Sequence, residues 1–90
     1  RRPAMSASSE IAVILPANLH ARPAGRLAQA AAGFQSAIEL EYGGRTVNPS
    51  GILTVLGLGA TAGCTVTIRA QGPDAEPATR ALALILAEAE

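Results

Sequence analysis

Short stretches in which apolar and polar residues alternate predict four β-strands. The first strand covers residues 11–15, where Ile, Val and Leu make it short and largely buried. Residues 38–42 alternate Ile, Leu and Tyr with Glu, and residues 64–70 alternate apolar residues with Thr and Arg, so each of these strands has one wet face. A Gly-Gly pair after the second strand forms a hairpin turn, from which residues 45–48 return as a short strand.

An amphipathic helix is predicted over residues 21–33. Its apolar residues recur at the spacing of one helix face. They are Leu27, Ala31 and Phe34. Pro23 fits only in a first turn, where the missing N–H group breaks no hydrogen bond, so the helix begins close to His20. Gly33 is the predicted stop.

Two further helices complete the prediction. Residues 52–58 form a short, very apolar helix, and a last helix opens at residues 72–74. The apolar stripe of the last helix consists of Ala78, Leu82, Ile85, Leu86 and Ala89. The order strand, helix, strand, strand, helix, strand, helix predicts a two-layer α+β sandwich, in which helices cover one face of a sheet.

Ninety residues indicate one domain, which we place at residues 10–90, and residues 1–9 are expected to be a flexible tail or a linker remnant. Seven basic residues balance seven acidic ones, so the charge predicts no nucleic-acid partner. No apolar run is long enough to span a membrane, so no membrane insertion is expected. A single cysteine, Cys64, excludes an internal disulfide and favours the cytoplasm; it is predicted to be a small buried residue of a strand.

His20, the only histidine, is the candidate for chemistry. It precedes a helix whose first N–H groups are unpaired and carry partial positive charge, which is a ready anion site. A ring nitrogen placed there could accept a phosphoryl group, with its oxygens bound by the amides and by Arg22. One His and one Cys offer no metal-ligand cluster, no cofactor is expected, and no nearby acid supports a hydrolytic triad.

Two apolar or glycine-rich segments carry weaker signals. Residues 57–63 are rich in Gly but lack the context of a nucleotide-binding loop, so a helix exit and turn is the better account. In the short helix, core packing accounts for Ile52 or Leu53 together with Val55 or Leu56. The remaining apolar side chains predict an exposed patch that contacts a partner protein.

Residues 19–24, which read LHARPA, closely resemble the active-site signature of the histidine-containing phosphocarrier protein (HPr) family of the phosphoenolpyruvate-dependent sugar phosphotransferase system. A second family block is matched by Val47-Asn48 and by apolar residues between positions 52 and 59. The likeness spans roughly residues 10–90. It implies an open-faced β-sandwich of connectivity βαββαβα, whose four-stranded antiparallel sheet has the order 1-4-2-3.

The resemblance also implies a function. His20 would accept a phosphoryl group on Nδ1 from the general first enzyme of the system and pass it to sugar-specific A components. Ala21 and Arg22 would bind the phosphoryl group. Such a protein is a carrier, expected to be monomeric, rather than an enzyme in the strict sense.

Partner docking and regulation are implied as well. Ile52, Leu53 and Leu56 match the apolar docking patch of the family, and Arg26 adds charge for acidic partners. A serine ahead of the short helix is phosphorylated in many members, but an ungapped count places that position on Gly51. Either Ser50 takes its place or this control is absent, and we favour absence; a helix N-cap is the alternative role for Ser50.

Three other functions stay open. A regulatory binding module of the same fold would dock partners without relaying phosphoryl groups, although the presence of both His20 and Arg22 disfavours it. The chain is also compatible with one domain of a fused multiphosphoryl transfer protein. A metabolite-sensing α+β domain is the third, and no cluster of polar pocket residues supports it.

Overall fold

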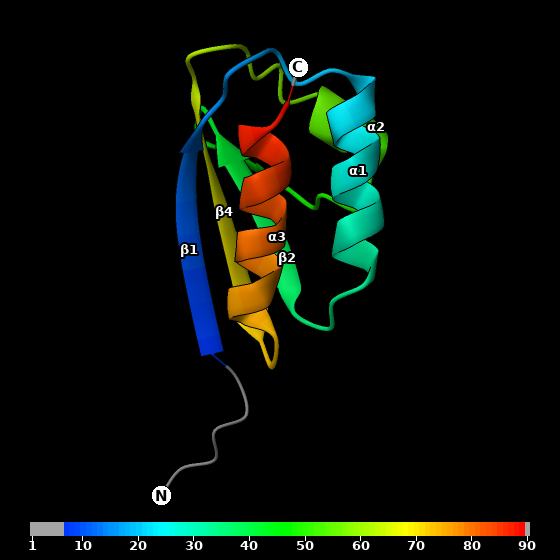
Figure 1. Ribbon diagram of the computed structural model, residues 1–90, viewed down its shortest axis with the longest axis vertical. Coiled ribbons are helices and arrows are strands. Elements are labelled where there is room, and N and C mark those ends of the chain that lie inside the picture. Colours follow the sequence, from blue (N-terminus) through cyan, green and yellow to red (C-terminus); the bar gives the residue numbers. More distant parts are fainter. Residues whose placement is uncertain (1–6, 90) are drawn as a thin grey trace, which may run out of the picture.

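The computed structural model describes residues 7–89 (Figure 1). Its elements follow the predicted order of strands and helices. They are β1 (Ala7–Ile14), α1 (Ala21–Ala32), β2 (Ala37–Tyr42), β3 (Arg45–Val47), α2 (Ile52–Leu56), β4 (Thr65–Gly72) and α3 (Ala75–Ala87). None of the helices in this part of the chain combines the length and the apolar character needed to cross a membrane.

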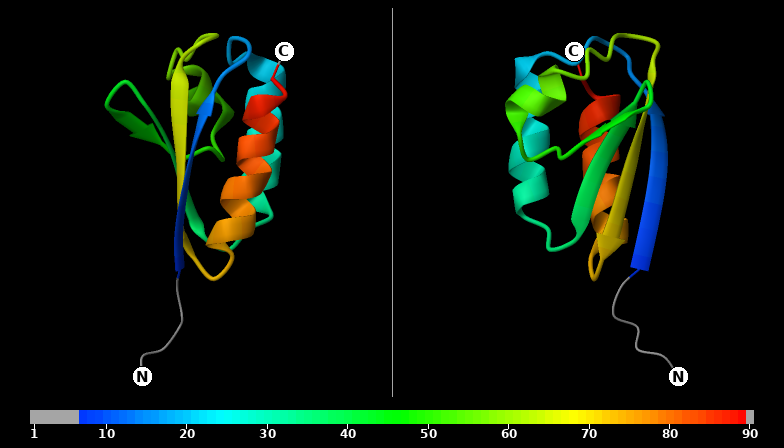
Figure 2. Two further views of the ribbon diagram at one scale, coloured as in Figure 1. Left: turned by 60° about the vertical axis from the view of Figure 1, so that its left-hand side comes forward. Right: turned by 180° about the vertical axis from the view of Figure 1, so that it is seen from behind.

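The strands form one antiparallel sheet in the order β1-β4-β2-β3, which confirms the predicted topology. Strand β4 lies in the middle and pairs with β1 on one side and with β2 on the other. Helices α1 and α3 lie side by side against one face of the sheet, and no helix of residues 7–89 covers the other face (Figure 2). The fold is therefore the expected two-layer α+β sandwich.

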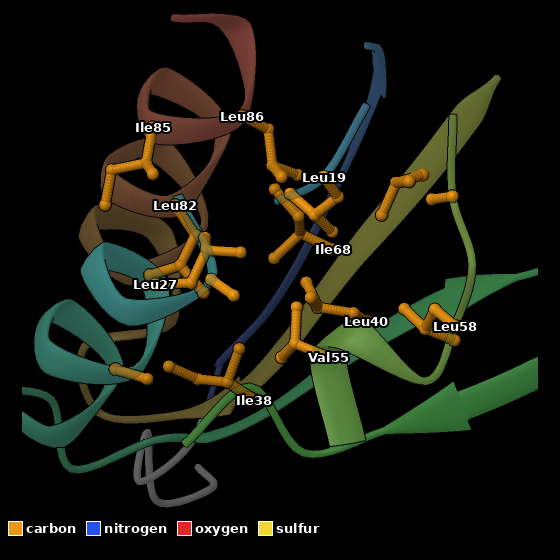
Figure 3. Close-up of a cluster of buried hydrophobic side chains, with 14 of the residues drawn as sticks. Leu19, Leu27, Ile38, Leu40, Val55, Leu58, Ile68, Leu82, Ile85 and Leu86 are labelled. Atoms are coloured by element: carbon orange, nitrogen blue, oxygen red, sulfur yellow. The ribbon is translucent and has the colours of Figure 1, made fainter. Parts of the chain in front are cut away.

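An aliphatic core fills the space between the sheet and the helices (Figure 3). Leu40 and Ile68 project from the sheet toward Leu27 of α1 and Leu82 of α3, and none of these four side chains is exposed to solvent. The chain has only one Phe and one Tyr, and the buried hydrophobic residues are all Leu, Ile, Val or Ala. Every residue of the predicted stripe of the last helix is buried.

Strand β1 differs from its prediction at both ends. It begins at Ala7 instead of residue 11, and it ends at Ile14. Ala7, Ser8 and Ser9, which we had assigned to the tail, pair with β4; residues 1–6 of that predicted tail lie outside the described part of the chain. The strand is half-buried rather than largely buried, because only one of its faces meets the helices, and Ile14 is 69% exposed on the other.

Cys64 also departs from its prediction. It lies just before β4 and is partly exposed instead of being a buried strand residue. Its Sγ atom is 3.3 Å from Thr61 Oγ1 and 3.1 Å from Tyr42 Oη. Hydrogen bonds from Thr61 and Tyr42 stabilise the thiolate and lower the pKa of Cys64.

Two helix ends are shorter than the apolar pattern indicated. Helix α2 ends at Leu56 with Gly57 as its C-cap, although Leu58 beyond it is buried in the core. Helix α3 ends at Ala87, so Ala89 contacts the core from the segment after the helix. Burial of an apolar side chain therefore continues past the end of the helical backbone.

A polar contact ties the start of α3 to the loop between α1 and β2. The Asp74 carboxylate accepts hydrogen bonds from the N–H groups of Gln35 and Ser36, both at 2.9 Å, and from Ser36 Oγ at 2.5 Å. The Ser36 hydroxyl, followed by these amides, lowers the pKa of Asp74. Gly72 has φ +148°, and a Cβ atom there would lie 2.7 Å from Ser36 Cα, so the close approach needs glycine.

Candidate functional site

His20 is the N-cap residue of α1, with an extended backbone (φ −85°, ψ −175°) and an exposed side chain. Its carbonyl accepts a hydrogen bond from the Ala24 N–H at 3.1 Å, which closes the first turn of the helix. Its own N–H donates to the Asn18 carbonyl at 3.0 Å. The imidazole makes no capping hydrogen bond. In the described part of the chain, hydrogen bonds therefore hold the backbone of His20 but not its ring.

The first turn of α1 presents unpaired backbone donors. Within residues 7–89, the N–H groups of Ala21 and Arg22 have no hydrogen-bond partner, and Pro23 has no N–H group. No acidic residue lies in this turn to neutralise the positive end of the helix dipole. Among the described residues, this turn therefore has the unpaired amides and the partial positive charge that favour an anion, and binding of a phosphoryl group there stays a prediction.

The loop that carries His20 is clamped to the segment before β4. The Leu19 N–H donates to the Ala60 carbonyl at 3.1 Å, and the Ala62 N–H donates to Asn18 Oδ1 at 2.9 Å. The Leu19 side chain is buried among the core residues (Figure 3). We did not predict a role for Asn18; the signal was an Asn in a loop, where such side chains commonly bind backbone groups.

Arg22 is exposed and lies on the same helix face as Arg26, one turn further along α1. Both line a small cavity of 60 Å³ together with Pro23, Glu88 and Ala89. The Arg26 guanidinium faces the Glu88 carboxylate at 3.7 Å. The predicted phosphoryl-binding arginine and the predicted docking arginine therefore share one site, and Glu88, which sequence reasoning missed, belongs to it.

Helix α2 carries an apolar surface patch, which we define as Ile52, Leu53 and Leu56. Leu53 is 82% exposed and Ile52 is 43% exposed, while Leu56 is half-buried against the core. Val55 is fully buried and anchors the helix. Figure 1 shows α2 beside the first turns of α1, so the patch lies at the same end of the molecule as His20.

Ser50 is not the N-cap of α2, contrary to one of the roles considered for it. The N-cap is Gly51, and the Ser50 N–H and hydroxyl instead donate to Asn48 Oδ1 at 2.9 and 2.8 Å. The Asn48 side chain can accept both hydrogen bonds because it lies only two residues before Ser50. Ser50 remains exposed.

A second cavity lies away from His20. It has a volume of 290 Å³ and lies along the β1-β4-β2 part of the sheet. Arg69 in its wall pairs with Glu41 at 2.5 Å and with Glu10 at 3.4 Å. These two carboxylates already balance the charge of Arg69, so we take the segment around His20 as the stronger candidate site.

Histidine phosphocarriers are the class of protein that combines this sandwich with an exposed histidine at the start of the first helix. The family model described as the PTS HPr component phosphorylation site matches residues 7–88. The chain therefore belongs to the HPr family of the phosphotransferase system.

Solved structures of relatives agree with this assignment. The histidine-containing phosphocarrier protein of a mycoplasma is 30% identical, with a TM-score of 0.80 over 90% of this chain and 100% of that one. HPr of Bacillus anthracis is 36% identical, with a TM-score of 0.77 over 90% and 96% of the two chains. Crh of Bacillus subtilis, a catabolite-repression protein crystallised as an intertwined dimer, is 38% identical, with a TM-score of 0.71 over 82% and 85%.

Proposed function

We propose that the protein accepts a phosphoryl group on Nδ1 of His20 from the general first enzyme of the phosphotransferase system and passes it to sugar-specific A components. The observation that supports this most directly is the exposed imidazole beside the unpaired amides of Ala21 and Arg22. As the bond from Nδ1 to phosphorus forms, the bond from phosphorus to the donor breaks. The amides and the Arg22 guanidinium stabilise the charge on the phosphoryl oxygens throughout.

A carrier also needs a site of moderate strength, because a phosphoryl group held too tightly would not be passed on. Two backbone amides and an exposed arginine side chain meet this need. The apolar patch on α2 lies at the same end of the molecule and offers partners a surface next to His20. Docking there would exclude water from the reacting groups, which strengthens these electrostatic contacts.

Incubation with phosphoenolpyruvate and a first enzyme of the system tests this function. We expect a phosphate that is labile in acid and stable in alkali, as phosphohistidine is. The His20→Ala variant should fold normally, because the ring is exposed and makes no hydrogen bond in the described residues, and it should carry no such phosphate. Labelling that persists in His20→Ala would contradict the assignment.

A second candidate function is a regulatory module that docks partners without relaying phosphoryl groups. The similarity to Crh, a catabolite-repression protein, favours it. The presence of both His20, at the N-cap of α1, and Arg22, in its first turn, favours the carrier. Failure of the wild-type protein to become phosphorylated in the same assay, with the fold intact, would support the regulatory module instead.

A further inference from the structure

The ion pair between Arg26 and Glu88 is loose. The Nη2 and Oε1 atoms are 3.7 Å apart, which is too long for a hydrogen bond, and the two side chains are 50% and 54% exposed. Within residues 7–89, Arg26 donates no side-chain hydrogen bond. The pair is therefore weak and easily exchanged, and no acceptor among residues 7–89 takes a hydrogen bond from the guanidinium.

Glu88 also lies where a carboxylate does little for the helix. It is the C-cap of α3, whose end carries partial negative charge, and the last turn of α3 contains no basic residue. Only its backbone N–H serves the helix, by donating to the carbonyls of Leu84 and Ile85. The side chain instead faces Arg26 across the small cavity that Arg22 also lines.

We propose that a phosphoryl group on His20 draws Arg26 away from Glu88, so that Arg26 joins Arg22 as a second guanidinium for the phosphoryl oxygens. This inference rests on the proposed function. Arg22 and Arg26 are one helical turn apart and line the same cavity. His20 does not line it, so the exchange requires the Arg26 guanidinium to extend along α1 past Arg22 toward the first turn. A phosphoryl group has more charge and more acceptor oxygens than a carboxylate, so it competes well for a loosely held guanidinium.

Glu88 is in this view a positioning residue that competes with the phosphoryl group for Arg26. In the unphosphorylated carrier it holds Arg26 in place and lowers the positive charge around the cavity. In the phosphorylated carrier Glu88 offers Arg26 an alternative partner, which weakens the hold on the phosphoryl group. The competition therefore favours release of the phosphoryl group to the next protein.

Titration with inorganic phosphate tests the competition directly, with amide chemical shifts of the first turn of α1 as the readout at constant ionic strength. Glu88→Gln should tighten phosphate binding by about twofold to fivefold, the range set by an exposed ion pair. Arg26→Gln should weaken binding by a similar factor, and the double variant should match Arg26→Gln alone. Glu76→Gln, which breaks the pair with Arg80 elsewhere on α3, is the matched control and should change nothing.

Unchanged phosphate affinity in Glu88→Gln would overturn the inference, and so would tightening of equal size when Arg26 is already Gln. The outcome is separable from that of the carrier assay. If the wild-type protein is phosphorylated on His20 but Glu88→Gln binds phosphate normally, the exchange is wrong and the carrier stands. If Glu88→Gln tightens phosphate binding while His20 accepts no phosphoryl group, the carrier function is wrong and the competition between Glu88 and an anion stands.

Discussion

At the scale of single residues, the site separates a fixed backbone from free side chains. Hydrogen bonds through Asn18, Leu19 and Ala24 hold the backbone around His20, whereas the His20 ring and the Arg22 side chain are exposed. The stability of the fold depends on the backbone contacts, and the proposed chemistry depends on the exposed side chains. Substitutions of the exposed side chains should therefore change the chemistry and leave the fold intact.

Arg22→Ala is the clearest case. We expect phosphoryl transfer to slow by about 10²-fold, as for the loss of one donor that stabilises developing charge. The free energy of unfolding should change by less than about 0.5 kcal/mol, because the side chain is exposed. Quenched-flow transfer rates and urea unfolding measure the two effects. Arg80→Ala on α3 is the control for transfer, and a large fall in stability of Arg22→Ala would contradict the separation.

The candidate reactive residues could be proposed from the sequence, because the residues around His20 are contiguous in it. The residues that hold these side chains and their loop in place could not be predicted. Asn18 binds the Ala62 amide and Arg26 faces Glu88 only after the chain has folded back on itself. No local pattern records such distant pairs, which is why both were missed.

At the scale of elements, periodicity predicted the strands and helices, and the errors lie at their ends. Residues 7–10 read Ala-Ser-Ser-Glu and show no apolar alternation. They form a strand because their backbone pairs with that of β4. Leu58 continues the apolar run of α2 but lies beyond its C-cap. Tertiary pairing and glycine placement thus set the boundaries that hydrophobic spacing left undefined.

The buried stripe of α3 yields a stability prediction. Leu82 is fully buried between the sheet and α1, so Leu82→Ala should lower the free energy of unfolding by about 2–5 kcal/mol through lost burial and a new cavity. Leu84 on the same helix is 59% exposed, and Leu84→Ala should cost less than about 0.5 kcal/mol. Urea unfolding measures the free energy of unfolding of both variants. An equal decrease in Leu82→Ala and Leu84→Ala would show that the buried face of α3 is assigned wrongly.

At the scale of the whole molecule, the contact of Asp74 with Gln35 and Ser36 joins the start of α3 to the loop after α1, at the end far from His20. Its strength depends on the charge of the carboxylate, because all of these partners donate hydrogen bonds to it. The contact between the start of α3 and the loop after α1 should therefore weaken in acid.

Asp74→Asn tests this contact. Because the native contacts lower the pKa of Asp74, its ionised form adds stability at neutral pH. That contribution disappears as the pH falls below the ordinary carboxyl value of about 4 and through the lowered native pKa. We expect Asp74→Asn to be less stable than the wild type at neutral pH, with the difference narrowing in acid. Urea unfolding across this pH range measures it, and a constant difference would refute the linkage.

The ends of the described chain lie at opposite poles of the molecule. Ala7 pairs with Gly72 at the pole away from His20, whereas Ala89 lines the same cavity as Arg22 (Figure 1). An affinity tag or a second domain joined on the amino-terminal side of Ala7 would lie far from His20. The same addition on the carboxyl-terminal side of Ala89 would lie next to Arg22 and Arg26 and would obstruct a protein that docks there. For binding measurements on a sensor surface, the protein should therefore be immobilised through its amino-terminal side.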